Sequence, residues 1–227
     1  MYAKHFKRPI DFCLSLVAII VLSPLILVLT VITAISMRGN PFFTQLRPGR
    51  HEKIFKLIKF RTMTNAKDEN GNLLPDSARL TKYGRFLRST SLDELPELLN
   101  ILKGDMAVIG PRPLLVRDMV FMTDDERRRH TVRPGLSGLA QVNGRNSISW
   151  EEKLKTDLKY IDSVTFFGDI KIIFKTIYIA VRREDINEED SDSATDLGDY
   201  LFNTGAISKE EYDNGMRHAE ELMDVVG

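Results

Sequence analysis

The feature that most constrains this chain is an uncharged, strongly apolar run of 26 residues, Phe12–Met37. As a helix, the run would extend about 39 Å, which exceeds the roughly 30 Å thickness of a bilayer's hydrocarbon core. A cleavable signal peptide is not expected, because its apolar region is normally only about 7–15 residues long. The run therefore predicts a segment that enters a membrane.

Ser23-Pro24 stands near the middle of this run. Proline removes a helical hydrogen bond and clashes with the preceding turn, and each half of about 12 residues reaches only ~18 Å. Positive residues favour the cytoplasmic side of a membrane. Here they flank both ends of the run: Lys4, Lys7 and Arg8 before it, and Arg38, Arg47, Arg50 and Lys53 after it. A re-entrant hairpin that bends at Ser23-Pro24 satisfies both observations, with the Ser23 hydroxyl bonding a carbonyl that the proline frees. A kinked helix that spans the membrane stays open as the alternative.

Charge divides the chain into two unequal parts. The whole chain has 32 basic and 32 acidic residues, but residues 1–183 hold 30 basic and 18 acidic side chains, whereas residues 184–227 hold 2 and 14. We interpret 184–196 as an acidic linker and expect two short helices beyond it, at about 196–203 and 209–226, with Ser208 and Glu211 at capping-box spacing. A helical hairpin of this size buries little apolar area. We therefore expect it to dock on the body, on a second copy or on another protein.

The first part after the membrane segment is predicted to be a small β-hairpin. Residues 42–46 and 53–62 have strand character and are joined around Pro48-Gly49, a turn-forming pair. Lys59 and Arg61 are two residues apart and share one strand face, which is either solvated or an anion contact. Residues 80–87 are predicted to form a helix. Lys82, Arg85 and Arg88 recur every three residues and therefore share one side, which is either solvated or faces a phosphate.

Residues 91–104, SLDELPELLNILKG, carry the densest signal. The leucine spacing predicts an amphipathic helix that ends at Gly104, and Ser91 and Glu94 have capping-box spacing. Asp93 and Glu94 therefore have two interpretations. They are acids that favour a helix N-terminus, or they are a catalytic pair placed where a helix also attracts phosphate.

Two further segments offer groups for an anion. In Gly110-Pro111-Arg112-Pro113 the prolines stiffen the backbone around one arginine, which suits either a surface turn or a phosphate contact. Residues 134–146 are glycine-rich, include Arg145, and either wrap a nucleotide or pack as a loop. Residues 150–183 read as helices, and 170–181 is apolar with basic residues beside it. This last stretch either lies on a membrane surface or packs into the core with a solvated edge.

The order and spacing of these motifs resemble the monotopic phosphoglycosyl transferases, bacterial enzymes that begin glycan assembly on a polyprenyl phosphate. The resemblance covers about residues 1–183. It rests on these motifs: Ser23-Pro24, Lys59-Phe60-Arg61-Thr62-Met63, Ser91-Leu92-Asp93-Glu94-Leu95-Pro96, Gly110-Pro111-Arg112-Pro113 and Arg133-Pro134-Gly135-Leu136-Ser137-Gly138.

The resemblance implies a re-entrant membrane helix (1–38) and a catalytic domain on the cytoplasmic face of the bacterial inner membrane (39–183). The acidic linker (184–196) and the small helical appendage (197–227) fall outside it and rest on composition and pattern. Together with the predicted β-hairpin and amphipathic interfacial helices, these parts give an expected α+β fold that is mostly helical.

The same resemblance implies transfer of a phosphosugar from a UDP-sugar, expected to be N-acetylated, to polyprenyl phosphate with release of UMP. Asp93 is the expected nucleophile and Glu94 its partner, and the two hold Mg²⁺. Arg112 is expected to bind the diphosphate, with further substrate contacts from Lys59, Arg61, Arg88, Pro111 and Arg145.

A different class remains as the alternative, namely a non-catalytic membrane adaptor that recruits glycosyltransferases. In such an adaptor, the appendage would bind those enzymes or a second copy of this chain. A nucleic-acid binder is not expected, because no recognised motif or aromatic stacking platform accompanies the basic body.

Overall fold

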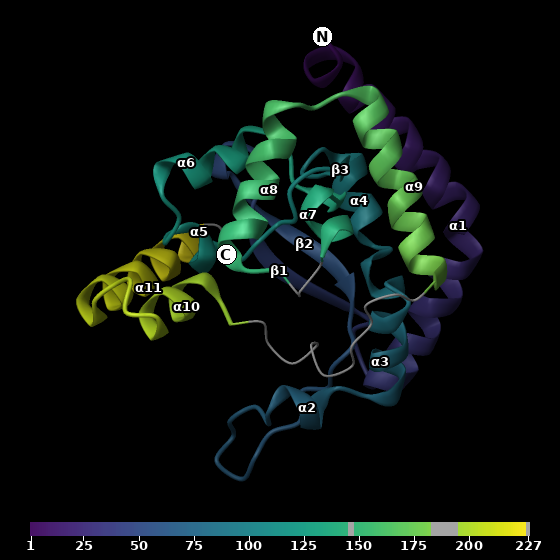
Figure 1. The fold of residues 1–227 in the computed structure, drawn as a ribbon. Helices are drawn as coiled ribbons and strands as arrows, with labels where there is room; N and C mark the ends of the chain where they lie inside the picture. Colours follow the sequence, from purple (N-terminus) through teal and green to yellow (C-terminus); the bar gives the residue numbers. More distant parts are fainter. Residues whose placement is uncertain (145–147, 183–194, 226–227) are drawn as a thin grey trace.

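The computed structural model describes residues 1–144, 148–182 and 195–225. These residues are mostly helical, with two small two-stranded sheets at the centre and one long helix along a side (Figure 1). The predicted α+β class with few strands is therefore confirmed. Most of the predicted acidic linker lies outside the described residues.

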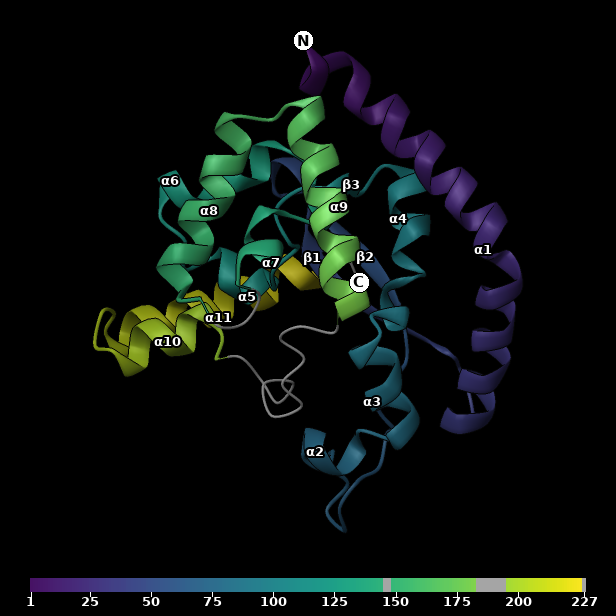
Figure 2. The same cartoon turned by 45° about the vertical axis from the view of Figure 1, so that its right-hand side comes forward.

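The long helix is α1 (Lys7–Met37), preceded by a π-helical turn at Tyr2–Phe6. It continues through Pro24 and follows a curved path (Figure 2). The Ser23 hydroxyl donates a 2.8 Å hydrogen bond to the carbonyl of Ile20, the carbonyl that Pro24, four residues later, leaves without an amide donor. The expected role of Ser23 is thus confirmed, while the re-entrant path through a membrane stays a prediction.

Both ends of α1 contact the rest of the protein. Near the start, Arg8 donates from Nη1 to the carbonyl of Ile101 at 2.6 Å and from Nη2 to that of Leu102 at 2.9 Å. Near the end, the hydroxyl of Thr33 lies 3.0 Å from that of Tyr83. One side of α1 therefore follows the body along its length.

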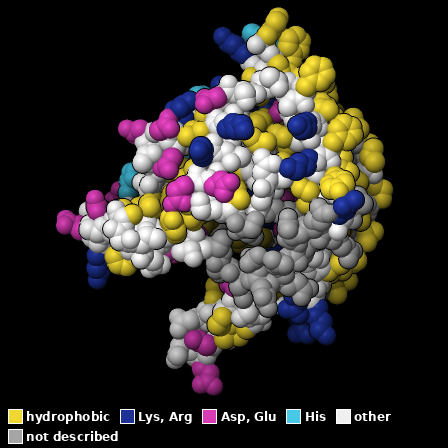
Figure 3. Space-filling view, in the orientation of Figure 1, with side chains coloured by type: hydrophobic (Ala, Val, Ile, Leu, Met, Phe, Trp, Pro, Cys, Tyr) yellow, Lys and Arg dark blue, Asp and Glu magenta, His cyan; other side chains and the backbone are white. Residues whose placement is uncertain are grey.

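The outer side of α1 is apolar and exposed. The exposed fraction reaches 68% at Val21 and 72% at Ile35. Hydrophobic side chains line the edge of the molecule where α1 runs, as Figure 3 shows on the right. Among the described helices, Tyr2–Met37 has the length and composition to cross a membrane.

The first sheet pairs β1 (Phe42–Pro48) with β2 (Ile54–Phe60) in antiparallel register, with Phe43 opposite Lys59. A short 3₁₀ turn, η2 (Arg50–Glu52), connects the two strands. The predicted β-hairpin is confirmed. Phe55 and Leu57 of β2 pack against Leu98 and Ile101 in a core that the inner side of α1 also joins.

The second sheet pairs β3 (Ala107–Ile109) with β4 (Gly135–Ser137) in parallel. Its glycines permit close contact between backbones. A Cβ on Gly135 would lie 2.1 Å from the amide nitrogen of Gly110, and one on Gly138 would lie 2.1 Å from the carbonyl oxygen of Gly110. The described part of the glycine-rich segment therefore packs against the 110–113 turn, as the loop-packing interpretation proposed.

The predicted helix over 91–104 is divided in two. Ser91 has a left-handed backbone (φ 54°, ψ 19°) and no side-chain capping bond, and residues Leu92–Glu94 form a single 3₁₀ turn, η3. Helix α4 (Glu97–Lys103) begins only after Pro96 and ends at Gly104, whose φ is 98°. The capping box between Ser91 and Glu94 is therefore wrong, and the two acids precede the helix.

The remaining helices surround the sheets. They are α2 (Asp76–Arg79), α3 (Lys82–Ser89), α5 (Val116–Met119), α6 (Asp124–Arg127) with η4 (Arg128–Thr131), α7 (Leu139–Asn143), α8 (Trp150–Asp162) and α9 (Phe166–Arg182). Helix α9 uses Ile172 in the core and exposes a second, aromatic side, with Phe167 81% exposed. The core-packing interpretation is therefore confirmed for one face of this helix, while contact of the other face with a membrane surface stays a prediction.

The C-terminal appendage consists of α10 (Leu197–Asn203) and α11 (Lys209–Asp224), and the capping box of Ser208 and Glu211 is present. It docks on α5, where Ala219 is buried against Val116 and Met119. The ring of Phe121 lies where Gly198 and Gly215 leave room for it, since a Cβ on either glycine would come within 2.4 Å of the ring. We expected the appendage to dock on the body, on a second copy or on another protein. The structure shows it docked on the body.

Candidate active site

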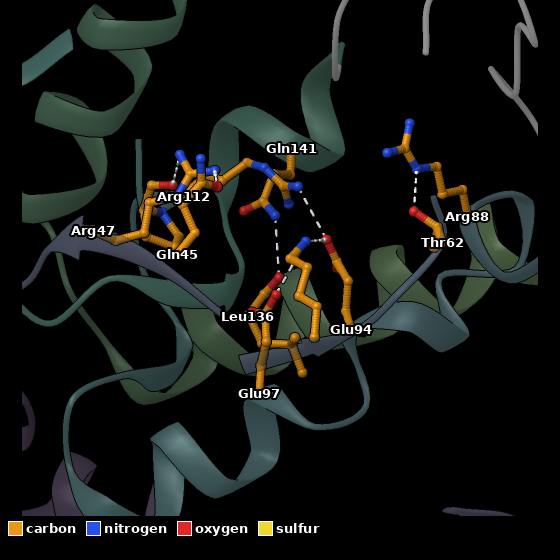
Figure 4. A network of polar contacts seen from close by, with 11 residues as sticks. Gln45, Arg47, Thr62, Arg88, Glu94, Glu97, Arg112, Leu136 and Gln141 are labelled. Atoms are coloured by element: carbon orange, nitrogen blue, oxygen red, sulfur yellow. Dashed lines mark hydrogen bonds and ion pairs between the residues drawn. The ribbon is translucent and has the colours of Figure 1, made fainter. Parts of the chain in front are cut away.

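Glu94 is the centre of a cluster of charged side chains between β2, η3 and the 110–113 turn (Figure 4). Its Oε1 accepts a hydrogen bond from Lys59 Nζ at 2.7 Å and one from Arg112 Nη2 at 3.0 Å. Burial is the largest single influence and would raise the pKa of Glu94, but the charges of Lys59 and Arg112 lower it to about 2. Glu94 is therefore ionised and held in place.

Asp93, the preceding residue, is also buried, with 8% of its surface exposed, but its carboxylate lacks the contacts that Glu94 makes. Within the described residues, its carboxylate forms no hydrogen bond or ion pair. Burial first, and then the negative charge of Glu94, raise the pKa of Asp93 to about 6, although Lys59 and Arg112 oppose the shift. Asp93 is thus a carboxylate with free lone pairs beside two fixed cations.

Lys59 also contacts a third carboxylate, since its Nζ lies 3.2 Å from Glu97 Oε1. Asn100, one turn further along α4, fixes this helix to β2 by donating to the carbonyl of Lys56 at 2.8 Å and accepting from the amide of Ile58 at 3.0 Å. These two bonds to the strand position Lys59 opposite Glu97. Burial, and then the charge of Glu94, raise the pKa of Glu97 to about 7.

Arg112 reaches this cluster from the 110–113 turn, whose backbone is fixed by a hydrogen bond from Arg129. Arg129 donates from Nη2 to the carbonyl of Arg112 at 2.7 Å and forms a buried ion pair with Asp157 at the same distance. Pro111 is buried beside Arg112, whereas the Arg112 side chain is 47% exposed. The negative charge of Glu94 raises the pKa of Arg112, which stays charged. The stiff-turn prediction is consistent with this fixed backbone.

The structure separates the other predicted substrate residues. Arg88 on α3 donates from Nε to the Thr62 hydroxyl at 3.2 Å, and its positive charge helps to lower the pKa of Asp93. Arg61 instead donates from Nε to the carbonyl of Met63 at 3.0 Å, and in the described residues it has no contact with the acidic cluster. Arg145 lies outside the described residues.

Two residues of the site, Glu97 and Gln141, were not predicted from the sequence, and Arg47, which lies close to Arg112 in Figure 4, was noted there only as a positive charge after the apolar run. The helix predicted over 91–104 did not single out Glu97, which is the first residue of α4 and whose carboxylate contacts Lys59 on β2. Its spacing of three from Glu94 was the available signal. Gln141 on α7 donates to the carbonyl of Leu136 at 3.1 Å, while its buried Oε1 has no partner in the described chain.

The donors in this cluster suit Mg²⁺ only if a substrate shares the ion. No group of three or more His, Cys, Asp or Glu side chains is arranged for a metal among the described residues. Mg²⁺ is, however, commonly held by one or two carboxylates together with substrate phosphates and water. The Asp93 carboxylate is unengaged, and both cations on Glu94 contact Oε1, which leaves its Oε2 available. The residues therefore fit an ion shared with a phosphate.

Comparison with known proteins identifies the family of this chain. The family model described as bacterial sugar transferase matches residues 2–183, and the chain belongs to that family. The match ends before the appendage.

Several relatives are similar over most of this chain. It is 46% identical over 182 residues to an uncharacterized sugar transferase, EpsL, of Bacillus subtilis, covering 80% of this chain and 90% of the relative. It is 35% identical over 200 residues to the undecaprenyl-phosphate galactose phosphotransferase of Salmonella typhimurium, and 38% identical over 183 residues to the UDP-glucose:undecaprenyl-phosphate glucose-1-phosphate transferase of Klebsiella pneumoniae. These alignments cover 80% and 76% of this chain, but only 42% and 39% of the two longer relatives.

Proposed function

We propose that this protein transfers a phosphosugar from a UDP-sugar to polyprenyl phosphate and releases UMP. The observation that carries the proposal is the contrast between the two adjacent acids: Glu94 is paired with Lys59 and Arg112, whereas Asp93 is buried beside the same cations with its oxygens unengaged. Family membership and the names of the Salmonella and Klebsiella relatives support the choice of reaction.

In the proposed first step, an Asp93 oxygen attacks the sugar-bearing phosphorus of the UDP-sugar. A bond forms between this oxygen and the phosphorus, the bond to the bridging oxygen breaks, and UMP leaves with that electron pair. In the second step, an oxygen of polyprenyl phosphate attacks the same phosphorus and the Asp93 carboxylate is released. Dividing one difficult displacement into two easier ones is the advantage of covalent catalysis.

Like charges oppose the first step, because a carboxylate must approach a diphosphate. Lys59 and Arg112 lie beside Asp93 and offset this repulsion, and Arg88 adds a positive charge near it. Mg²⁺ bound through Asp93 and Glu94 would supply further neutralisation of the phosphate oxygens. Arg112, with its exposed side chain, is the residue we assign to the diphosphate.

Membrane attachment through α1 fits this chemistry, because polyprenyl phosphate presents its phosphate at the interface. We propose that α1 is re-entrant and that the body lies on the cytoplasmic face of the bacterial inner membrane. Contacts between the body and both ends of α1 support this path. An N-acetylated sugar and a role in the first membrane step of glycoconjugate biosynthesis complete the proposal.

A panel of UDP-sugars with undecaprenyl phosphate and Mg²⁺, read by UMP release from the detergent-purified protein, tests the proposal. We expect one donor to release UMP with the wild type and with the control variant, and Asp93→Asn to release none. The conservative surface variant Asp125→Asn serves as the matched control. Absence of UMP release with every donor would favour the adaptor alternative.

A further inference from the structure

Arg47, on strand β1, is a cation without an acidic partner in the part of the chain that the structure describes. It donates from Nη2 to Gln45 Oε1 at 2.6 Å and from Nη1 to the carbonyl of Pro113 at 3.3 Å. Its Nε is buried and has no hydrogen-bond partner. A guanidinium has five N–H donors, so several are left for a ligand.

A second cation lies beside it. Figure 4 shows Arg47 and Arg112 close together, with Arg112 extending toward Glu94. Burial and, after it, the charge of Arg112 lower the pKa of Arg47 to about 10. Asp118, Glu97 and Asp196 act against this shift, but none of them forms an ion pair with Arg47 among the described residues. A buried cation without a direct ionic partner is costly, and a neighbouring like charge adds to the cost. Since Glu94 is shared by Arg112 and Lys59, neither arginine has a carboxylate to itself, and this pair of cations suits an added anion.

We propose that Arg47 binds the nucleoside-side phosphate of the UDP-sugar and retains it as the phosphate of UMP. The assignment deepens the proposed function and rests on it. Asp93 and Glu94 mark where the sugar-side phosphorus reacts, and Arg112 connects Glu94 with Arg47. The other phosphate of the diphosphate then lies toward Arg47. When the bridging bond breaks, this phosphate keeps the electron pair and gains negative charge, which Arg47 stabilises.

Arg47 also has a structural contact, the bond to Pro113, which neighbours Arg112. A purely positioning role would therefore act through Arg112. The two roles differ in a double-mutant cycle, because a direct phosphate contact persists when the Arg112 side chain is absent, whereas a positioning effect vanishes.

The experiment measures binding of UMP and of uridine to the detergent-purified, full-length protein by calorimetry or by inhibition of UMP release. Arg47→Met preserves length without charge, and Arg50→Met is the matched control. Arg50 is exposed and its Nε bonds the carbonyl of Thr131, away from the cluster. We expect Arg47→Met to weaken UMP binding about tenfold or more, the range for loss of a charged hydrogen bond, and to leave uridine binding unchanged. Arg47→Lys should recover part of the affinity.

The same substitution is then made in the Arg112→Ala protein, where a further loss of UMP affinity supports direct binding. No further loss, an equal loss for uridine, or unchanged UMP affinity would overturn the proposal. A raised KM for undecaprenyl phosphate with unchanged UMP affinity would also overturn it, because Arg47 would then hold the lipid phosphate. Arg47-dependent UMP binding without any transfer would overturn the proposed reaction while leaving this site intact.

Discussion

Lys59 on β2 donates to Glu94 at 2.7 Å across 35 residues of sequence, and this contact distinguishes two adjacent acids. Glu94 becomes a fixed, ionised anchor for Lys59 and Arg112. Asp93 lies in the same electrostatic surroundings but keeps its carboxylate oxygens unengaged. The following predictions depend on this division of roles.

Replacing Asp93 by Asn should abolish turnover, because an amide cannot act as the attacking carboxylate. We expect the rate of UMP release to fall by more than about a thousandfold. Intact-mass spectrometry after incubation with the UDP-sugar alone should show a phosphosugar adduct on wild type and on Asp125→Asn. An adduct of the same mass on Asp93→Asn would reject Asp93 as the nucleophile.

Activity should depend on pH through Asp93, whose pKa is raised to about 6 by burial and by Glu94. The attacking form is the ionised one, so kcat/KM should fall as the pH decreases through about 6 and level off above it. Because Mg²⁺ favours the ionised carboxylate, more Mg²⁺ should move the midpoint to lower pH. Profiles at two Mg²⁺ concentrations measure both effects. A profile that is flat between about pH 5 and 8 would contradict this assignment.

Lys59→Met should shift the same acid limb upward, because the Lys59 charge lowers the pKa of Asp93. The substitution also leaves the buried Glu97 without its cation; because the pKa of Glu97 is already raised to about 7, it should become protonated, and a loss of stability of about 1–3 kcal/mol is expected. Lys56→Met, on the same strand with an exposed side chain, is the control. The pH profile and a denaturant titration check the two effects separately, and an unshifted acid limb would remove Lys59 from the electrostatics of Asp93.

Cysteine labelling can determine on which side of the membrane each end of α1 lies. Single cysteines at Lys4 and at Asn40, in a protein whose exposed Cys13 is replaced by Ser, mark the two ends of the helix. Because both ends of α1 contact the same body, we expect both sites to resist a membrane-impermeant maleimide in intact spheroplasts and to react in inverted vesicles. Labelling of the two sites from opposite sides would establish a spanning helix.

Gly215→Leu should release the appendage from the body. A Cβ at this position would lie 2.4 Å from the Phe121 ring, and overpacking of this kind costs about 1–3 kcal/mol. Limited proteolysis should then remove residues beyond 195, whereas the exposed variant Asp213→Leu should resist. UMP release should persist, because the family match covers residues 2–183. Unchanged protease resistance of Gly215→Leu would mean that the glycine is not needed for docking.

Local patterns in the sequence predicted the elements that depend on nearby residues. The apolar run of α1, the hairpin of β1 and β2, and the capping box at Ser208 arise from hydropathy, turn residues and short-range hydrogen bonds. Where two local signals competed, the prediction was wrong. Ser91 and Glu94 had capping-box spacing, but α4 begins only after Pro96. The Glu94 side chain instead accepts hydrogen bonds from Lys59 and Arg112.

The sequence by itself thus determined that the chain has a long apolar helix, a small hairpin and a set of acids and cations in a family-specific order. Only the tertiary structure decided which cation meets which acid. Lys59 reaches Glu94 and Glu97, Arg129 holds the turn of Arg112, and Arg47 is left without an acidic partner in the described residues. The physical reason is range: helices and turns follow from residues a few positions apart, whereas burial and charge pairing depend on segments that only the fold brings together.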